Sequence, residues 1–206
     1  MNNLFSSRRV FILSLLILIF GMPPLASAEN YVRAKIGVLF MEGDQTRLAK
    51  STDSVKPGTQ MQIHVIPEKN CFVYLINTDG KQATWLNWGQ DQQQVPLGEE
   101  RIFPSKSSLY QQNGSGQNES FTVICSPRKL NELTQLFSTR SASLTEWTAL
   151  ENKWLADSRI PLGETLAKPF GIAGSVRAST EQPSRDFKVY SGNAMLVKKY
   201  DFNVEK

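Results

Sequence analysis

Short segments rich in β-branched and aromatic residues recur between residues 31 and 125, and turn signals such as Pro57-Gly58 and Asp79-Gly80 separate them. No helical spacing of apolar residues lies between these segments. Consecutive strands at this spacing favour an antiparallel β-sandwich or a barrel-like domain. The predicted strands are residues 31–42, 60–66, 71–76, 82–88, 101–103 and 121–125.

Two of these segments indicate which faces are buried. In residues 60–66, Met61, Ile63 and Val65 alternate with polar side chains, which is typical of a strand with one face in the core. Residues 71–76 (CFVYLI) are apolar on both faces, which indicates a central strand covered on both sides. We therefore expect this strand near the middle of its sheet.

A pair of helices is predicted after these strands. Residues 130–137 place their leucines and Phe137 on one helical face, and Pro127 suits the first turn of that helix. Ser143 and Glu146 have the spacing of a capping box, which marks the start of a second helix. The second helix is expected to pack on the β domain through its apolar face, which consists of Trp147, Leu150, Trp154 and Leu155.

The last part of the chain predicts one more strand. Residues 157–193 are punctuated by glycine, proline and serine, and they are expected to be irregular. Residues 194–204 alternate again, with Leu196, Tyr200 and Phe202 on one face. We therefore expect a C-terminal strand that returns to the sheet.

The N-terminal residues have the pattern of an export signal. Arg8 and Arg9 precede an apolar run over residues 10–22, and Ala26 and Ala28 give the small-x-small pattern that a signal peptidase reads. Cleavage is expected after Ala28, and no later segment is apolar enough to span a membrane. An uncleaved anchor is disfavoured because a helix of that run rises about 20 Å, whereas the bilayer core measures about 30 Å.

Three segments are expected along the chain. Residues 1–28 form the signal peptide, residues 29–137 form a β-rich domain, and residues 138–206 form a helical and irregular extension. The terminal strand of the extension is expected to pack on the β-rich domain. The style of the signal indicates a bacterial protein of the periplasm, with secretion as the alternative.

The charge of the chain argues against nucleic acid as a partner. The formal net charge of +4 falls by half once Arg8 and Arg9 leave with the signal, and no basic block remains. Binding of nucleic acid needs clustered lysines and arginines. One histidine and two cysteines are too few for a Cys/His zinc site, so neither a metal nor another cofactor is expected.

Three motifs follow one another between residues 50 and 137. They are a central strand with an Asp-Gly turn (73–77, VYLIN), an IFP element (102–104) and a strand that ends in serine (123–127). In this order they resemble the family catalogued as domain of unknown function 4384. The family has Leu-Phe-Pro-Asn where this chain has WLNWG (85–89). Its members occur in exported regions, sometimes attached to protease-like or kinase domains, which implies an accessory or interaction role and supplies no catalytic residues.

No catalytic site is predicted. His64 is the only imidazole, so a Ser-His-Asp or Cys-His site would have to use it. By strand alternation His64 points away from the apolar face of its strand, and no nucleophile motif such as G-x-S-x-G surrounds a candidate. A solvent-facing histidine is therefore the expected role, and a hydrolase is the third choice of function.

A disulfide between Cys71 and Cys125 is predicted. Cys71 opens one predicted strand and Cys125 closes another, so antiparallel pairing of the two strands would bring them together. Disulfides persist in exported proteins. This disulfide requires that the Cα atoms of the two cysteines lie about 5.5–6 Å apart. The alternative is a pair of buried free thiols.

The candidate binding surface consists of Trp85, Asn87, Trp88 and Gln90. Tryptophans beside amide side chains can stack on sugar rings and hydrogen-bond to their hydroxyl groups, and tryptophan is equally enriched in protein contacts. A third interpretation makes Trp85 a core residue at a strand end and the glutamine-rich run a solvated loop. We expect a non-enzymatic interaction module of the cell envelope with a protein partner, and a glycan- or cell-wall-binding module as the alternative.

The signal prediction can be tested by intact-mass spectrometry. The exported protein should begin at Glu29, because the peptidase cleaves after the second small residue of its motif. An exported protein that retains residues 1–28 would contradict the prediction. Ala28→Leu should slow processing, and Ser27→Leu is the matched control because the middle position of the motif is not read.

Overall fold

The protein is described here from a computed structural model, in which residues 31–205 belong to one compact unit. The structure describes this range except for residues 44, 52, 91–93, 113–117 and 162–185. The signal peptide predicted for residues 1–28, with its cleavage residues Ala26 and Ala28, lies outside the described residues.

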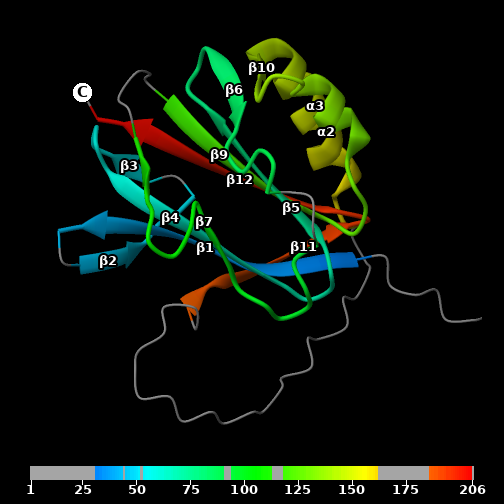
Figure 1. The fold of residues 1–206 in the computed structure, drawn as a ribbon, viewed down its shortest axis with the longest axis horizontal. Coiled ribbons are helices and arrows are strands. Elements are labelled where there is room, and N and C mark those ends of the chain that lie inside the picture. The colour runs from blue at the N-terminus through cyan, green and yellow to red at the C-terminus, as the bar shows by residue number, and fades with distance from the viewer. Residues whose placement is uncertain are drawn as a thin grey trace, which may run out of the picture. The chain divides into compact units, whose positions relative to one another are not determined.

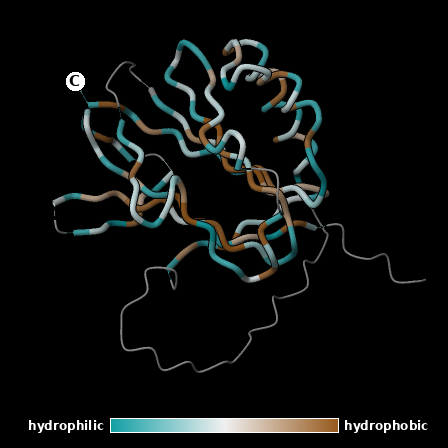
Figure 2. The backbone as a smooth tube through the Cα atoms, in the orientation of Figure 1, coloured by the Kyte–Doolittle hydropathy of each residue, from teal (hydrophilic) through white to brown (hydrophobic). Residues whose placement is uncertain are grey.

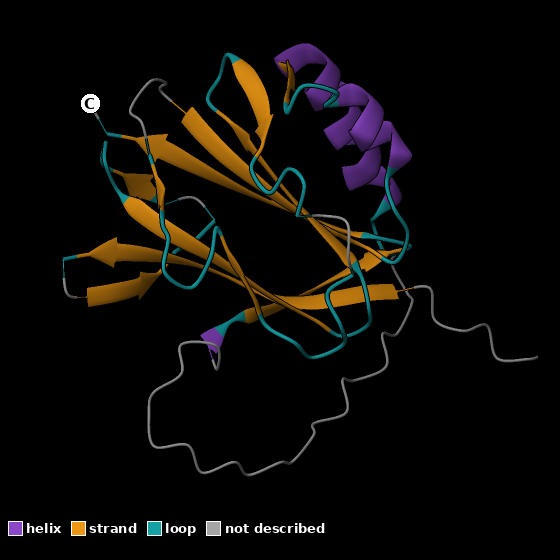
Figure 3. Ribbon diagram, viewed as in Figure 1, coloured by secondary structure: helices purple, strands orange, loops and turns teal. Residues whose placement is uncertain are grey.

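The described residues form two β-sheets and two helices (Figures 1 and 3). Strands predominate, so the prediction of a mainly β sandwich is confirmed, and the sheets stay separate rather than closing into a barrel. The elements are β1 (Tyr31–Glu42), β2 (Gln45–Leu48), β3 (Ser54–Val55), β4 (Gln60–Pro67), β5 (Phe72–Thr78), β6 (Gln82–Trp85), β7 (Arg101–Phe103), β8 (Tyr110–Gln111), β9 (Asn118–Ser126), α2 (Asn131–Leu136), β10 (Ser141–Ser143), α3 (Leu144–Asp157), β11 (Lys188–Asn193) and β12 (Leu196–Val204).

The first sheet, called sheet A here, is antiparallel and has the order β11-β1-β4-β7. The long strand β1 pairs with β4 along one side. Along its other side, β1 pairs with β11 near its start and with β2 near its end. The short strand β8 pairs with the beginning of β4.

The second sheet, sheet B, has the order β10-β6-β5-β9-β12-β3. All of its pairs are antiparallel except β12 with β3, which is parallel. The C-terminal strand β12 lies between β9 and β3, and β11 belongs to sheet A. Residues beyond 137 therefore supply strands to both sheets, and they belong to the same unit as residues 31–137.

The main core lies between the two sheets. Met61, Ile63 and Val65 of β4 are fully buried there, as the alternation of residues 60–66 predicts. Val73 and Leu75 of β5 face them from sheet B. Figure 2 shows the apolar stretches along the facing strands of the two sheets. This packing buries one face of each sheet.

A second core covers the other face of sheet B. Tyr74 and Ile76, which alternate with the inward residues of β5, pack against the helix layer. Both faces of β5 are therefore buried, as the sequence CFVYLI predicts. The helix layer contributes a buried cluster of Leu133, Phe137, Trp147 and Trp154.

The predicted start of the second helix is confirmed. Ser143 caps α3: its hydroxyl accepts a hydrogen bond from the Glu146 amide at 3.3 Å and donates one to the Glu146 carboxylate at 2.6 Å. Trp147 and Trp154 on the predicted apolar face are buried against sheet B. The first helix, α2, begins at Asn131, so Pro127 precedes it instead of lying in its first turn.

An ion pair adds a polar contact between α3 and sheet B. The buried carboxylate of Glu151 accepts a hydrogen bond from Thr122 of β9, and it lies 3.2 Å from the Lys199 ammonium of β12. Burial lowers the pKa of Lys199, but the carboxylates of Glu151 and Asp201 outweigh this effect, so the pKa is raised. The contact fixes the helix over the middle strands of the sheet.

Two predicted segments also differ from the structure. Residues 157–193 are predicted to be irregular, and residues 162–185 of this range lie outside the described residues. The prediction is wrong for residues 188–193, which form β11 and whose polar sequence KVYSGN carries no alternation signal. The strand predicted over residues 82–88 ends at Trp85. The chain turns after this residue, and the side chain of Asn87 donates a hydrogen bond to the Val73 carbonyl of β5. Among the described residues, neither helix is long and apolar enough to cross a membrane.

Truncation of Trp154 tests how much stability the helix layer contributes. Trp154→Ala should lower the free energy of unfolding by about 3–5 kcal/mol, because the side chain is buried against sheet B. Urea unfolding followed by circular dichroism measures this change. Asn152→Ala, at an exposed position of the same helix, is the control and should change stability by less than about 0.5 kcal/mol. A similar small loss for Trp154→Ala would contradict the burial of this face.

Candidate functional site

Asn87 joins the loop after β6 to the middle of sheet B. Its Oδ1 accepts hydrogen bonds from the Leu75 amide and from Nε1 of Trp85, both at 2.9 Å. Its Nδ2 donates to the Val73 carbonyl at 2.8 Å. The side chain is buried, so it is part of the structure and not available to a ligand. The predicted role of Asn87 in a binding surface is therefore wrong.

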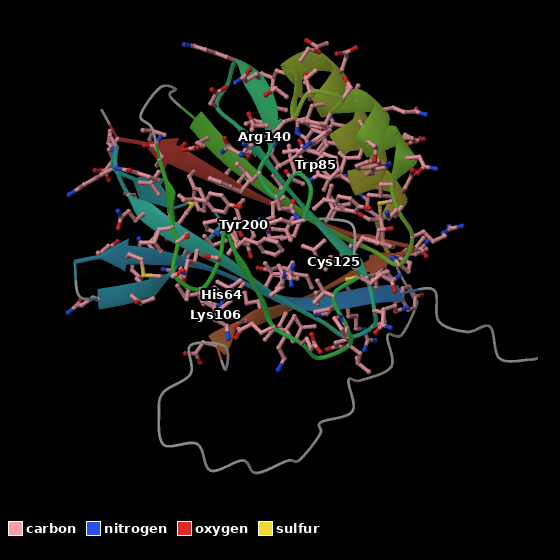
Figure 4. The ribbon with its side chains drawn as sticks, viewed as in Figure 1. His64, Trp85, Lys106, Cys125, Arg140 and Tyr200 are labelled. Carbon is pink, nitrogen blue, oxygen red and sulfur yellow. The ribbon has the colours of Figure 1, made fainter. Side chains whose placement is uncertain are left out.

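Trp85 is also a structural residue. Only 1 % of its surface is exposed, and its ring packs at 5.6 Å from Tyr74 and at 6.1 Å from Phe137, measured between ring centroids. Its ring nitrogen is already bound by Asn87. Trp85 cannot stack on a ligand, and the interpretation of it as a core residue at the strand end is correct. Figure 4 shows it beside the helix layer.

The exposed part of the predicted surface is Trp88 with Gln90. Trp88 is 39 % exposed, and it meets the buried ring of Trp85 edge to face at a centroid distance of 4.9 Å. Gln90 is exposed as well. Of the four predicted residues, Trp85 and Asn87 are therefore buried beneath the surface, and Trp88 and Gln90 are exposed to solvent. Sequence reasoning missed this division because amide side chains look alike whether they bind solvent or the backbone.

Gln90 borders a hollow of about 370 Å³ beside β7. Charged and polar side chains from β7 and the residues around it line this hollow: Glu100, Arg101, Ser105 and Lys106. Such groups can hydrogen-bond to hydroxyls or charged side chains of a partner. The hollow thus extends the polar surface on which Gln90 lies.

A larger hollow, of about 490 Å³, lies between the two helices and the turn that joins β11 to β12. Glu132 and Lys153 line it, and their side chains bind each other at 3.1 Å. The same Glu132 carboxylate accepts a hydrogen bond from Trp154 Nε1 at 3.3 Å. Glu132 and Lys153 are thus engaged in holding α2 to α3, and Arg128, Lys129 and Asp157 also line the hollow.

His64 is buried, so the prediction of a solvent-facing histidine is wrong. Its Nδ1 lies 2.9 Å from the Glu100 carboxylate, and its ring packs at 5.3 Å from the ring of Phe187. The strand alternation was correct, because His64 does point away from the core between the sheets. Phe187, which immediately precedes β11, covers that outer face, and no local signal connects the two residues. In Figure 4, His64 lies on sheet A, away from Trp85.

Gly37 makes room for this cover. It lies directly opposite His64 in the pairing of β1 with β4. A Cβ at this position would lie 2.3 Å from two ring atoms of Phe187, which is too close for any side chain. The aromatic ring therefore lies over the bare backbone of β1, where it shields the imidazole from solvent.

The arrangement around His64 supports a structural role. The imidazole is held by a carboxylate on one side and covered by an aromatic ring on another. Its Nε2 is buried and has no hydrogen-bond partner within the described part of the chain. Nor do the described residues gather three His, Cys, Asp or Glu side chains that could hold a metal ion.

The predicted disulfide between Cys71 and Cys125 is not formed. The structure has both as buried free thiols. Their strands do pair antiparallel, but Cys125 lies opposite Val73, which places Cys71 diagonally across from it. Diagonal neighbours have Cα atoms about 7–8 Å apart, beyond the limit of about 7 Å for a disulfide. A hydrogen bond with Cys71 and burial raise the pKa of the Cys125 thiol.

No family model matches the chain, and no curated protein or solved structure matches it either. The resemblance to the domain of unknown function 4384 therefore stays a prediction from its motifs. Function has to be inferred from the contacts and the exposure of this chain's own residues.

A thiol assay distinguishes the diagonal register from a disulfide. In the native protein neither cysteine should react with a thiol reagent at mildly alkaline pH, because both are buried and the pKa of Cys125 is raised. After unfolding without reductant, both thiols should react. Cys71→Ser is the control and should leave one reactive thiol. A wild-type chain with no reactive thiol after unfolding would contradict the register.

Proposed function

We propose that this protein is a non-enzymatic interaction module of the bacterial cell envelope. The export pattern of residues 1–28 supports a periplasmic location, with secretion as the alternative. The burial of His64 under Phe187 supports a role without catalysis, because the only imidazole of the chain is then withdrawn from any substrate. No cofactor takes part in the proposed role.

The observation that carries the proposal is the support beneath Trp88. Two hydrogen bonds hold Asn87 to β5, a third joins it to the ring of Trp85, and the ring of Trp88 rests on Trp85. An exposed tryptophan with a fixed position loses little conformational freedom when a partner covers it. Tryptophan is over-represented among the residues that contribute most to binding at protein interfaces. Its side chain also offers a large contact area. We infer a protein partner that covers Trp88.

A glycan or the cell wall is the second candidate ligand. An exposed indole ring can stack on the apolar face of a sugar, and Gln90 beside it can bind hydroxyl groups. The hollow that Gln90 shares with Arg101 and Lys106 adds further hydrogen-bonding groups. With Trp85 buried, however, a single ring remains for stacking, which favours the protein partner.

Replacement of Trp88 tests this proposal. The purified mature protein is immobilised, and periplasmic extract and purified cell-wall glycan are offered to it separately. A protein should be retained by the wild type and lost with Trp88→Ala, because removal of a central tryptophan costs about 2 kcal/mol of binding or more, which is roughly thirtyfold in affinity.

The matched control is Leu97→Ala, because Leu97 is an apolar residue that is 64 % exposed elsewhere on the surface. It should retain the partner as the wild type does, and Trp88→Phe should keep part of the binding. Equal retention by Trp88→Ala would contradict the proposal. If Trp88→Ala loses binding to the glycan and not to a protein, the ligand at Trp88 is the cell wall and not a protein partner.

A further inference from the structure

The strand β11 forms one edge of sheet A (Figure 1). It pairs antiparallel with the first half of β1, from Tyr31 opposite Asn193 to Ile36 opposite Lys188. No strand among the described residues pairs with its other side. The second half of the same side of β1 is covered by β2, so β11 is the outermost strand at this edge.

The direction of the backbone groups of β11 follows from one hydrogen bond. The Asn193 amide donates to the Ser158 carbonyl at 2.9 Å, so the backbone of Asn193 points away from β1. In an antiparallel ladder such outward groups occur at every second residue. The amides and carbonyls of Ser191 and Val189 therefore point outward too. Within the described part of the chain these four groups have no hydrogen-bond partner.

An exposed valine and two exposed lysines lie at or beside this edge, and the exposed Asp186 precedes β11. Val189 is 44 % exposed, and it lies opposite Lys35 of β1. Lys35 and Lys188 are both exposed, and neither forms an ion pair with a described carboxylate. Among the described residues, the edge thus combines unpaired backbone groups with two lysines that form no ion pair.

We propose that the outer edge of β11 is a docking site for an extended, acidic segment of another protein, which adds to sheet A as a further strand. The backbone of such a segment would bind the amides and carbonyls of Val189 and Ser191. Its acidic side chains would pair with Lys188 on one face of the sheet and, beyond Val189, with Lys35 on the other face. Strand addition of this kind takes its affinity from main-chain hydrogen bonds and its specificity from the side chains.

The charges argue against a second copy of this chain as the occupant. A second copy would present the same strand, whose sequence KVYSGN contains no carboxylate to pair with Lys35 or Lys188. The edge also differs from the Trp88 surface, so this inference goes beyond the proposed function, and Trp88→Ala should leave strand addition unchanged.

The test uses a fluorescent peptide in which pairs of valines alternate with pairs of glutamates, so that an extended strand carries glutamate on both faces. The peptide is added to the mature protein, and binding is followed by anisotropy. Ser191→Pro removes one outward amide, and its dissociation constant should rise about tenfold, because one hydrogen bond is lost. Proline is tolerated on an edge strand where the amide faces solvent. Ser191→Thr, which keeps the amide, is the matched control and should bind as the wild type does.

The charge is tested without changing the backbone. Lys35→Glu should weaken binding of the acidic peptide, whereas Lys56→Glu, an exposed lysine on the turn after β3, should not. A peptide with lysine in place of glutamate should bind the wild type more weakly than the acidic peptide. Hydrogen exchange should show that the Val189 and Ser191 amides become protected when the acidic peptide is added.

Three results would overturn the proposal. The first is binding of the acidic peptide that neither Ser191→Pro nor Lys35→Glu weakens. The second is no measurable binding of the peptide to the folded wild-type protein. In that case the lysines serve only to prevent other chains from pairing with this edge. The third is a dimer in sedimentation that Ser191→Pro dissociates, which would make a second copy the occupant.

Discussion

Sheet B has to be covered on both of its faces, and the rest of the architecture depends on this requirement. Val73 and Leu75 of β5 face sheet A, whereas Tyr74 and Ile76 face the helices. A strand that is apolar on both sides would expose one side to water in a simple two-sheet sandwich. The helix layer removes that exposure, and the pair of Glu151 with Lys199 fixes α3 where the cover is needed.

The same requirement explains why a polar residue is buried beside the sheet. Where β6 ends, the middle of β5 still has backbone groups to satisfy, and an unpaired buried group is costly. Asn87 satisfies the Val73 carbonyl and the Leu75 amide with one side chain. Its remaining contact holds Trp85 in the second core, and this places Trp88 at the surface. The exposed ring is thus positioned by the packing of the interior.

Local signals allowed much of the fold to be predicted from the sequence. The alternation around Met61 and the capping box at Ser143 each depend on a few neighbouring residues, and the structure has both. The candidate site was harder, because it depends on register and on contacts between distant residues. The cover of His64 by Phe187 and the diagonal position of the cysteines follow from how whole strands align, which no short window of sequence records.

The place of the last two strands has a consequence for the order in which the molecule can form. The first strand of the unit, β1, is paired near its start with β11, and β12 completes the centre of sheet B beside β9. Neither core can close until these late segments of the chain are present. Contacts between such distant segments slow folding and keep apolar strands open in the meantime. Until residues 188–204 have been synthesised, each sheet therefore lacks a strand, and a partly synthesised chain cannot bury either core completely.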